Sequence, residues 1–135
     1  MNNKSTGSCL CKKVKYEVEG NFERFFLCHC KFCQKDTGSA FAANMFSTSA
    51  KLTWISGEDL TKTFNLANTR HVKNFCSNCG AALPSIQNNG KLIVVPAGSL
   101  DVPVDVKPNA HLFVGSKANW EEKLEQLQSF EGLPG

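Results

Sequence analysis

The sequence predicts a mostly β fold with one or two short helices. Short strand-like segments recur along most of the chain, turn residues separate them, and only two segments have helical composition. No internal repeat, low-complexity tract or linker divides the 135 residues. We therefore expect a single domain that spans residues 1–135 and is long enough to bury one core.

The composition argues against several classes of protein. Apolar residues make up 41% of the chain and charged residues 20%, which excludes a disordered chain. No apolar run reaches the length of about 18 residues that a membrane span needs, so no membrane partner is expected. The N-terminal sequence lacks the apolar segment of a secretory signal, so we expect a cytoplasmic protein. Nearly all the cations are lysines, whereas arginine suits phosphates and base edges better, so we expect no nucleic-acid partner.

The first strand is predicted at residues 13–18, where apolar and polar residues alternate. Its apolar side chains lie on one face: Val14, Tyr16 and Val18. The opposite face would be exposed to solvent. Gly20 and Asn21 are typical of a turn, and residues 22–28 are predicted to return as a second strand.

A short helix is predicted at residues 30–37, and it would end at Gly38, which suits a left-handed C-cap. Six further short strands are predicted: residues 41–46, 51–55, 62–66, 70–76, 81–86 and 92–96. An Asn-Asn-Gly sequence at residues 88–90 is typical of the hairpin turn before the last of these.

The end of the chain is predicted to contain a final strand at residues 111–114 and then the only substantial helix, at residues 118–127. The helix is predicted from composition. Its exposed acidic face would carry Glu121, Glu122 and Glu125.

The seven cysteines are the most informative residues. Their number is odd, so they cannot all form disulfides within one chain, and in a reducing compartment clustered cysteines indicate metal ligands or catalytic thiols. They form C-x-C, C-x-C-x-x-C and C-x-x-C-G clusters: Cys9 and Cys11; Cys28, Cys30 and Cys33; Cys76 and Cys79. This clustering predicts metal binding.

The spacings fit the coordination of zinc by thiolates. Within C-x-x-C the chain turns tightly and brings two sulfurs to one tetrahedral ion. In C-x-C on a strand both side chains project from the same face, because the side-chain period is two. Gly80, just after Cys79, suits a positive φ that lets backbone N–H groups point at the thiolates. Soft thiolate ligands select zinc before magnesium or calcium.

The number of sulfurs separates two kinds of site. One four-coordinate ion uses four of the seven and leaves three, and the three closest in sequence are Cys28, Cys30 and Cys33. Because a three-ligand site keeps a position open for water or substrate, this group is the candidate catalytic site, with a second and labile zinc. The remaining pairs would form a closed structural zinc site: Cys9, Cys11, Cys76 and Cys79.

Other interpretations stay open at this point. The two pairs could be buried cysteines without metal, and the group of three could be a second structural site or metal-free thiols. Cys30 and Cys33 could also form a redox pair near a helix start. His29 could be a fourth ligand, a proton shuttle or an outward-facing residue, whereas His71 and His111 are interpreted as structural histidines.

Several segments, in this order, carry a resemblance to a known family: Gly7-Ser8-Cys9-Leu10-Cys11 before the strand with Val14 and Tyr16, Cys28-His29-Cys30-Lys31-Phe32-Cys33-Gln34-Lys35 before Thr37-Gly38-Ser39-Ala40-Phe41, Phe75-Cys76-Ser77-Asn78-Cys79-Gly80, Ala97-Gly98-Ser99-Leu100-Asp101, and His111-Leu112-Phe113 with Lys117, Ala118 and Trp120. Together they resemble the family of glutathione-dependent formaldehyde-activating enzymes and centromere protein V. The resemblance covers essentially the whole chain.

The resemblance implies a zinc-stapled, mostly β domain of the β-tent type, with two zinc ions held by the same two cysteine groups as the sulfur count predicts. The family's activity is carbon–sulfur lyase chemistry that joins formaldehyde and glutathione reversibly, so the implied substrates are a small thiol and a small aldehyde. Beside the metal loop, His29 is expected to move a proton, and Thr37, Gly38 and Ser39 to donate hydrogen bonds to substrate. The centromere-protein branch suggests an alternative, a non-catalytic zinc-stapled binding module.

Overall fold

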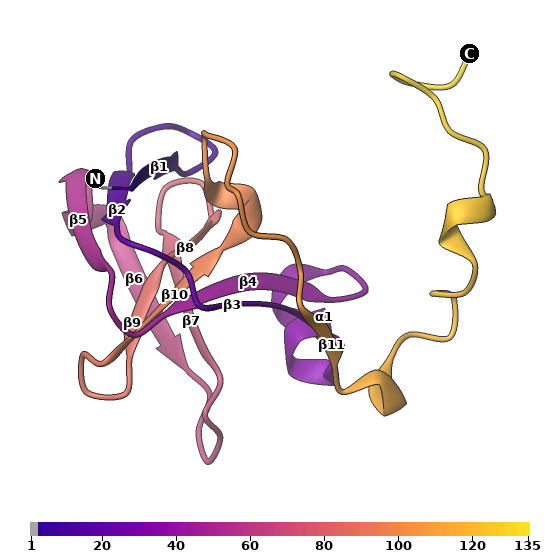
Figure 1. Cartoon of the computed structure of the whole chain (residues 1–135), viewed down its shortest axis with the longest axis horizontal. Helices are drawn as coiled ribbons and strands as arrows, with labels where there is room; N and C mark the ends of the chain where they lie inside the picture. Colours follow the sequence, from indigo (N-terminus) through magenta and orange to yellow (C-terminus); the bar gives the residue numbers. More distant parts are fainter. Residues whose placement is uncertain (1–2) are drawn as a thin grey trace.

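The computed structural model describes residues 3–135, so the first two residues of the predicted domain lie outside the described part. Three small sheets confirm the mostly β fold (Figure 1). The first sheet is antiparallel and has the order β1-β2-β5, formed by Lys4–Ser8, Lys15–Glu19 and Lys51–Ser56. The predicted alternation is present in β2, where Tyr16 and Val18 are fully buried and Lys15 is exposed.

Strand β1 was not predicted from the sequence, because its residues are polar and small and show no apolar alternation. It forms by pairing along the whole of β2, with Gly7 opposite Tyr16. A Cβ atom at Gly7 would overlap the Tyr16 ring, so glycine lets the backbone of β1 pass directly over this buried side chain.

The second sheet has the order β11-β3-β4-β10-β9, formed by Ala110–Leu112, Arg24–Cys28, Ala42–Ser47, Leu92–Pro96 and Ser85–Gln87. Two side chains of this sheet are fully buried: Met45 in β4 and Val95 in β10. The turn predicted at residues 88–90 joins β9 to β10, with Asn88 and Asn89 at positive φ. β11 pairs in parallel with β3 and ends with Leu112 beside Cys28, so a late segment of the chain lies next to an early one.

The third sheet has the order β6-β7-β8, formed by Thr61–Asn65, Val72–Cys76 and Ala82–Leu83. The single strand predicted at residues 81–86 is wrong, because Pro84 divides it. Pro84 has no backbone N–H to continue the ladder, and its carbonyl oxygen accepts a hydrogen bond from Asn74 Nδ2 at 2.7 Å. The chain therefore passes from the third sheet into the second at this residue, as β8 ends and β9 begins.

The helix predicted after the second strand is confirmed as α1, Lys31–Thr37. The Cys30 side chain is its N-cap and accepts a hydrogen bond from the backbone N–H of Cys33 at 3.4 Å. Gly38 is its C-cap in the left-handed region, with φ 67°. Four short 3-10 turns complete the structure: Glu58–Leu60, Ala97–Ser99, Val114–Ser116 and Leu124–Gln126.

The helix predicted at residues 118–127 is wrong. Only the short turn Leu124–Gln126 forms there, and Figure 1 shows the segment leaving the body of the protein as an extended arm. A helix of this length is marginal in water unless an apolar face packs against the rest of the protein, and here none does. The predicted acidic face is also corrected, because the Glu121 side chain is only 13% exposed.

Among residues 3–135, none of the helices has the length and apolar character that would be needed to cross a membrane.

Candidate functional site

Four cysteine sulfurs converge between the first and third sheets. Cys9 and Cys11 lie in the turn after β1, Cys76 ends β7, and Cys79 lies in the turn before β8. All four Sγ atoms lie within 4.8 Å of one another, with Cys9 to Cys11 at 3.5 Å and Cys11 to Cys76 at 4.0 Å. A tetrahedral zinc with bonds of about 2.3 Å needs sulfurs about 3.8 Å apart, so this donor set fits that ion.

Local backbone geometry holds these sulfurs in place. Gly80 takes a positive φ of 79°, and its N–H donates to the Cys76 carbonyl oxygen at 2.7 Å. Asn78 Nδ2 donates to Cys11 Sγ at 3.2 Å. This hydrogen bond, together with a backbone hydrogen bond from Lys13, lowers the pKa of Cys11 to about 6. The thiolate that a metal requires is therefore already favoured at neutral pH.

Three further sulfurs converge where β3 meets α1. Cys28 ends β3, Cys30 caps α1 and Cys33 lies inside the helix, and their Sγ atoms lie within 4.8 Å of one another. The pKa values of the three thiols are shifted in different directions. Burial and the neighbouring sulfurs raise the pKa of Cys33, and burial also raises the pKa of Cys28. Burial opposes ionisation of Cys30 as well, but hydrogen bonds from the Cys33 backbone and from its sulfur neighbours lower the pKa of Cys30.

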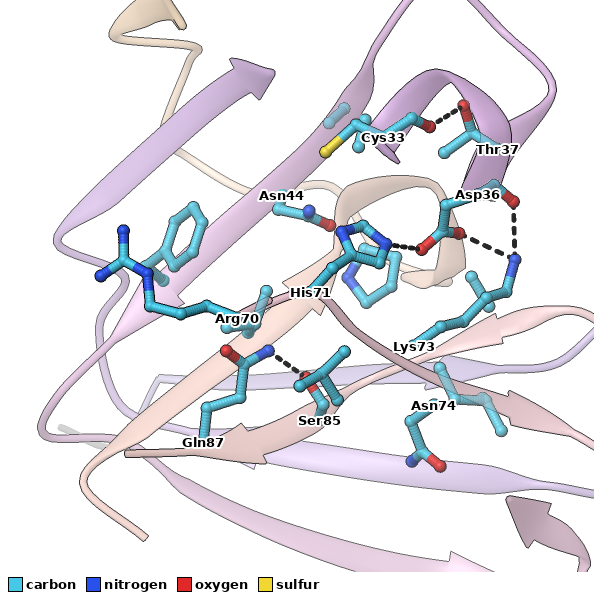
Figure 2. Close-up of a pocket in the computed structure, with 18 residues that line it drawn as sticks. Cys33, Asp36, Thr37, Asn44, Arg70, His71, Lys73, Asn74, Ser85 and Gln87 are labelled. Carbon is cyan, nitrogen blue, oxygen red and sulfur yellow. Dashed lines mark hydrogen bonds and ion pairs between the residues drawn. The ribbon is translucent and has the colours of Figure 1, made fainter. Parts of the chain in front are cut away.

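The three-cysteine group borders a large cavity of about 980 Å³. Cys28, Cys30 and Cys33 form one side of the cavity wall. The rest of the wall comes from segments distant in sequence, mainly the β6–β7 and β9–β10 connections. A smaller adjoining cavity of about 210 Å³ shares Cys33, Arg70 and His71 with the large one (Figure 2). This group is thus open to a small molecule on one side, through Cys28 and Cys30, which are partly exposed, and Cys33, which is buried.

The comparison with known families agrees with this arrangement. The sequence model described as "Glutathione-dependent formaldehyde-activating enzyme" matches residues 4–116, which include all seven cysteines. The chain belongs to this family. Among curated proteins, no sequence matches the chain significantly.

The formaldehyde-activating family member is also similar in fold to a solved structure. That structure is a crystal structure of a Rhodobacter sphaeroides protein, with a TM-score of 0.57 and 22% sequence identity. The match covers 78% of this chain and 98% of that chain. At this level of identity the likeness supports the fold alone.

His71 and Asp36 form a hydrogen-bonded pair beside the cavities of this family member, where His71 lines both cavities and Asp36 lines the smaller one (Figure 2). His71 Nε2 donates to Asp36 Oδ2 at 2.7 Å, and Lys73 Nζ donates to the Asp36 carbonyl oxygen and pairs with its Oδ1, both at 2.8 Å. The sequence predicted a structural histidine at His71. The prediction is incomplete, because the residue also lines the two cavities. Arg70 and His71 precede β7, and sequence spacing gave no reason to place them beside Cys33.

His29 lies between two metal-loop cysteines in sequence but points into the protein. Its side chain is 1% exposed, so the outward-facing alternative is wrong. Its Nδ1 is 2.8 Å from Glu121 Oε1, and its Nε2 is 2.8 Å from His111 Nδ1. Both ring nitrogens are thus engaged by residues from the end of the chain, and within residues 3–135 the two groups that could hold a metal ion contain only sulfurs.

Replacing Glu121 with alanine is expected to lower the free energy of unfolding by about 1–3 kcal/mol, because buried His29 Nδ1 would lose its partner. The matched control is Glu122→Ala, because the Glu122 carboxylate contacts only the exposed Lys117, at 3.2 Å. That change is expected to stay within about 0.5 kcal/mol of the parent protein. Urea unfolding measures both values, and equal stabilities for the two variants would contradict the role given to Glu121.

The residues expected to bind substrate beside the metal loop are placed differently from one another. Thr37 borders the smaller cavity, but its Oγ1 donates to the Cys33 carbonyl oxygen at 2.9 Å. Gly38 and Ser39 are exposed, and neither is among the residues that line the two cavities. Hydrogen bonding of these three residues to substrate stays a prediction.

Proposed function

We propose that this protein is a zinc-dependent enzyme of the carbon–sulfur lyase type that forms and breaks thiol adducts of small aldehydes. The observation that carries the proposal is the group of Cys28, Cys30 and Cys33 at the wall of a cavity of about 980 Å³. The family name supports S-hydroxymethylglutathione, the adduct of glutathione and formaldehyde, as the first substrate to examine. A cytoplasmic location would supply both the thiol and the reduced cysteines.

The proposal assigns two zinc ions to the chain, with different tasks. The four-cysteine group would hold a structural ion, and the three-cysteine group would hold a second, labile one with an open position. Bound there, zinc would act as a Lewis acid toward negative charge on the substrate's sulfur or oxygen. Cys28, Cys30 and Cys33 hold that position at the cavity wall, and the surrounding side chains orient the substrate.

The reaction needs no further reagent. A thiol sulfur forms a bond to the aldehyde carbon, the carbonyl π bond breaks, and the thiol proton ends on the new hydroxyl oxygen. His71 is placed to hold that proton. Its Nε2 donates to Asp36, so Nδ1 is the ring nitrogen that remains to accept a proton. The proton transfer predicted for His29 stays a prediction, and the bonds of His29 to Glu121 and His111 support a positioning role.

Arg70 would recognise the acidic groups of the thiol substrate. It borders both cavities, and no hydrogen bond or ion pair engages it within residues 3–135. A guanidinium binds a carboxylate through two parallel hydrogen bonds, and glutathione carries two carboxylates.

Replacing Arg70 with alanine is therefore expected to raise KM for glutathione about tenfold with little change in kcat. Arg24→Ala is the matched control, because Arg24 borders neither cavity and its guanidinium contacts only the Glu23 carbonyl oxygen. With a neutral thiol such as 2-mercaptoethanol as substrate, the Arg70 variant and the parent protein should have the same KM. Equal KM values for glutathione in the parent and the Arg70 variant would exclude this role.

The test of the proposed function is the number of zinc ions per chain, measured by native mass spectrometry on freshly purified, reduced protein with and without glutathione. Two zinc ions, one labile and perturbed by glutathione, would support the open site. One tightly held zinc, with Cys28, Cys30 and Cys33 free to be alkylated and indifferent to glutathione, would overturn it. Reversible oxidation of Cys30 and Cys33 would then favour the redox alternative, and thiols that do not oxidise reversibly would favour a binding module.

A further inference from the structure

The C-terminal arm, defined as residues 118–135, is attached to the body only at its beginning. Ala118 is buried, and Glu121 contacts His29. Beyond that point, no hydrogen bond or ion pair joins residues 122–135 to residues 3–116. Figure 1 shows the arm (yellow) running away from α1 and β11 into open space.

The arm is rich in apolar side chains that contact little of the chain. Five of them recur every three or four residues and are exposed: Trp120, Leu124, Leu127, Phe130 and Leu133. Leu127 is 65% exposed and Phe130 53%. Scattered single apolar residues are normal on a surface, but a continuous series of large ones marks a surface that binds something.

The charge of the arm is opposite to that of the body. Four glutamates and one lysine give the arm a formal charge of −3, whereas the 14 cations and eight carboxylates of residues 1–117 give +6, which together make the +3 of the chain. A body of the same sequence is therefore electrostatically complementary to the arm.

The body also carries a groove of matching chemistry. The groove has a volume of about 350 Å³, and its apolar wall consists of Phe32, Phe64 and Leu66. Phe32 and Phe64 are about half exposed. Lys35 and Lys73 stand at its sides, and the carboxylate of Asp36, which also borders the groove, is already paired with Lys73 and His71. An acidic, apolar segment fits this surface.

We propose that the arm of one molecule lies in the Phe32–Phe64 groove of a second copy, and that the two copies exchange arms in a symmetric dimer. The root of the arm is fixed by the buried Glu121–His29 contact, which directs it away from its own body. A stable interface needs about 800 Å² and about 20–30 residues on each side. One arm supplies fewer, whereas reciprocal exchange gives each copy both an arm and a groove in the same contact.

The exchange would place the partner's arm next to the cavity of the three-cysteine group, because Phe32 borders both that cavity and the groove. The inference does not depend on the proposed activity. Failure of the dimer would leave the zinc count per chain unaffected, and a dimer could form whether or not the second zinc is present, so the two proposals can be distinguished.

The first test is the self-association of the full-length, zinc-loaded protein, measured by sedimentation over a range of concentrations. The double variant Leu127→Ser, Phe130→Ser is expected to weaken the dimer about 100-fold, because two large apolar side chains would no longer be buried. Ile55→Ser is the control, because Ile55 is 58% exposed on β5, outside both the arm and the groove. A monomer at every concentration, or a dimer that the arm variant leaves unchanged, would overturn the proposal.

The second test identifies what the arm contacts. A mixture of unlabelled and isotope-labelled chains is allowed to exchange and is then treated with a carbodiimide, which joins carboxylates to neighbouring lysines. Links from Glu125 or Glu131 to Lys35 or Lys73 are expected between chains of different labels. Links confined to one chain would show that the arm folds onto its own body, and the absence of links to the groove would exclude the groove as the contact.

Discussion

Replacing Cys79 with serine is expected to unfold the protein at ordinary temperature. Cys79 belongs to the four-sulfur group that ties the turn after β1 to the turn between β7 and β8, two segments more than 60 residues apart in sequence. The binding energy of a structural zinc is folding energy, so losing one of its ligands should cost about 5 kcal/mol or more. That loss is comparable to the whole stability of an ordinary domain.

Thermal unfolding together with the metal content of the purified protein tests this expectation. Ser77→Ala is the matched control, since Ser77 lies in the same turn, is exposed, and offers only its backbone N–H to Leu60. A chelator strong enough to remove zinc should unfold the parent protein in the same way, and added zinc should refold it. A Cys79 variant that has lost its metal but has the same melting temperature as the parent protein would show that this group is not a structural centre.

Replacing Cys30 with serine is expected to abolish turnover while leaving the fold intact. Serine is among the best N-cap residues, so it can take over the hydrogen bond that Cys30 accepts from Cys33 and preserve α1. It is a poor substitute for a thiolate ligand, so the proposed second zinc should be lost. The rate with a thiol–aldehyde adduct should fall about a thousandfold or more, because several kcal/mol of charge stabilisation would disappear.

Turnover of the adduct, zinc per chain and the melting temperature decide this prediction together. Lys31→Ala serves as the control, because Lys31 is exposed at the start of the same helix and borders neither of the two cavities. Unchanged turnover in the Cys30 variant, measured with a substrate that the parent protein converts well, would rule out the three-cysteine group as the catalytic site.

Much of the fold could be predicted because its signals are local. The alternation around Tyr16, the Asn-Asn-Gly turn, and the helix between Cys30 and Gly38 each depend on residues close together in sequence. β1 lacked such a signal, since a polar strand is specified by its partner. Pro84 was a local signal that should have divided the predicted strand, because proline cannot extend the ladder of a central strand.

The candidate site was predicted in part for the same reason. The cysteines could be sorted into four and three because short spacings bring together the sulfurs within each cluster, and one four-coordinate ion leaves the three that are closest in sequence. The rest of the cavity wall could not, because Arg70 and His71 carry no motif and reach Cys33 only through the pairing of separate sheets.

The sequence by itself determined the mostly β class and the capped helix, which follow from patterns over a few residues, and the division of the cysteines, which follows from their clustering and from the four ligands that one zinc ion takes. Only the tertiary structure decided that His29 is buried between His111 and Glu121, that β8 and β9 belong to different sheets, and that residues 118–127 belong to an arm instead of a helix. These outcomes depend on burial and pairing between segments far apart in the chain, and whether an amphipathic segment becomes a helix depends on what its apolar face can pack against.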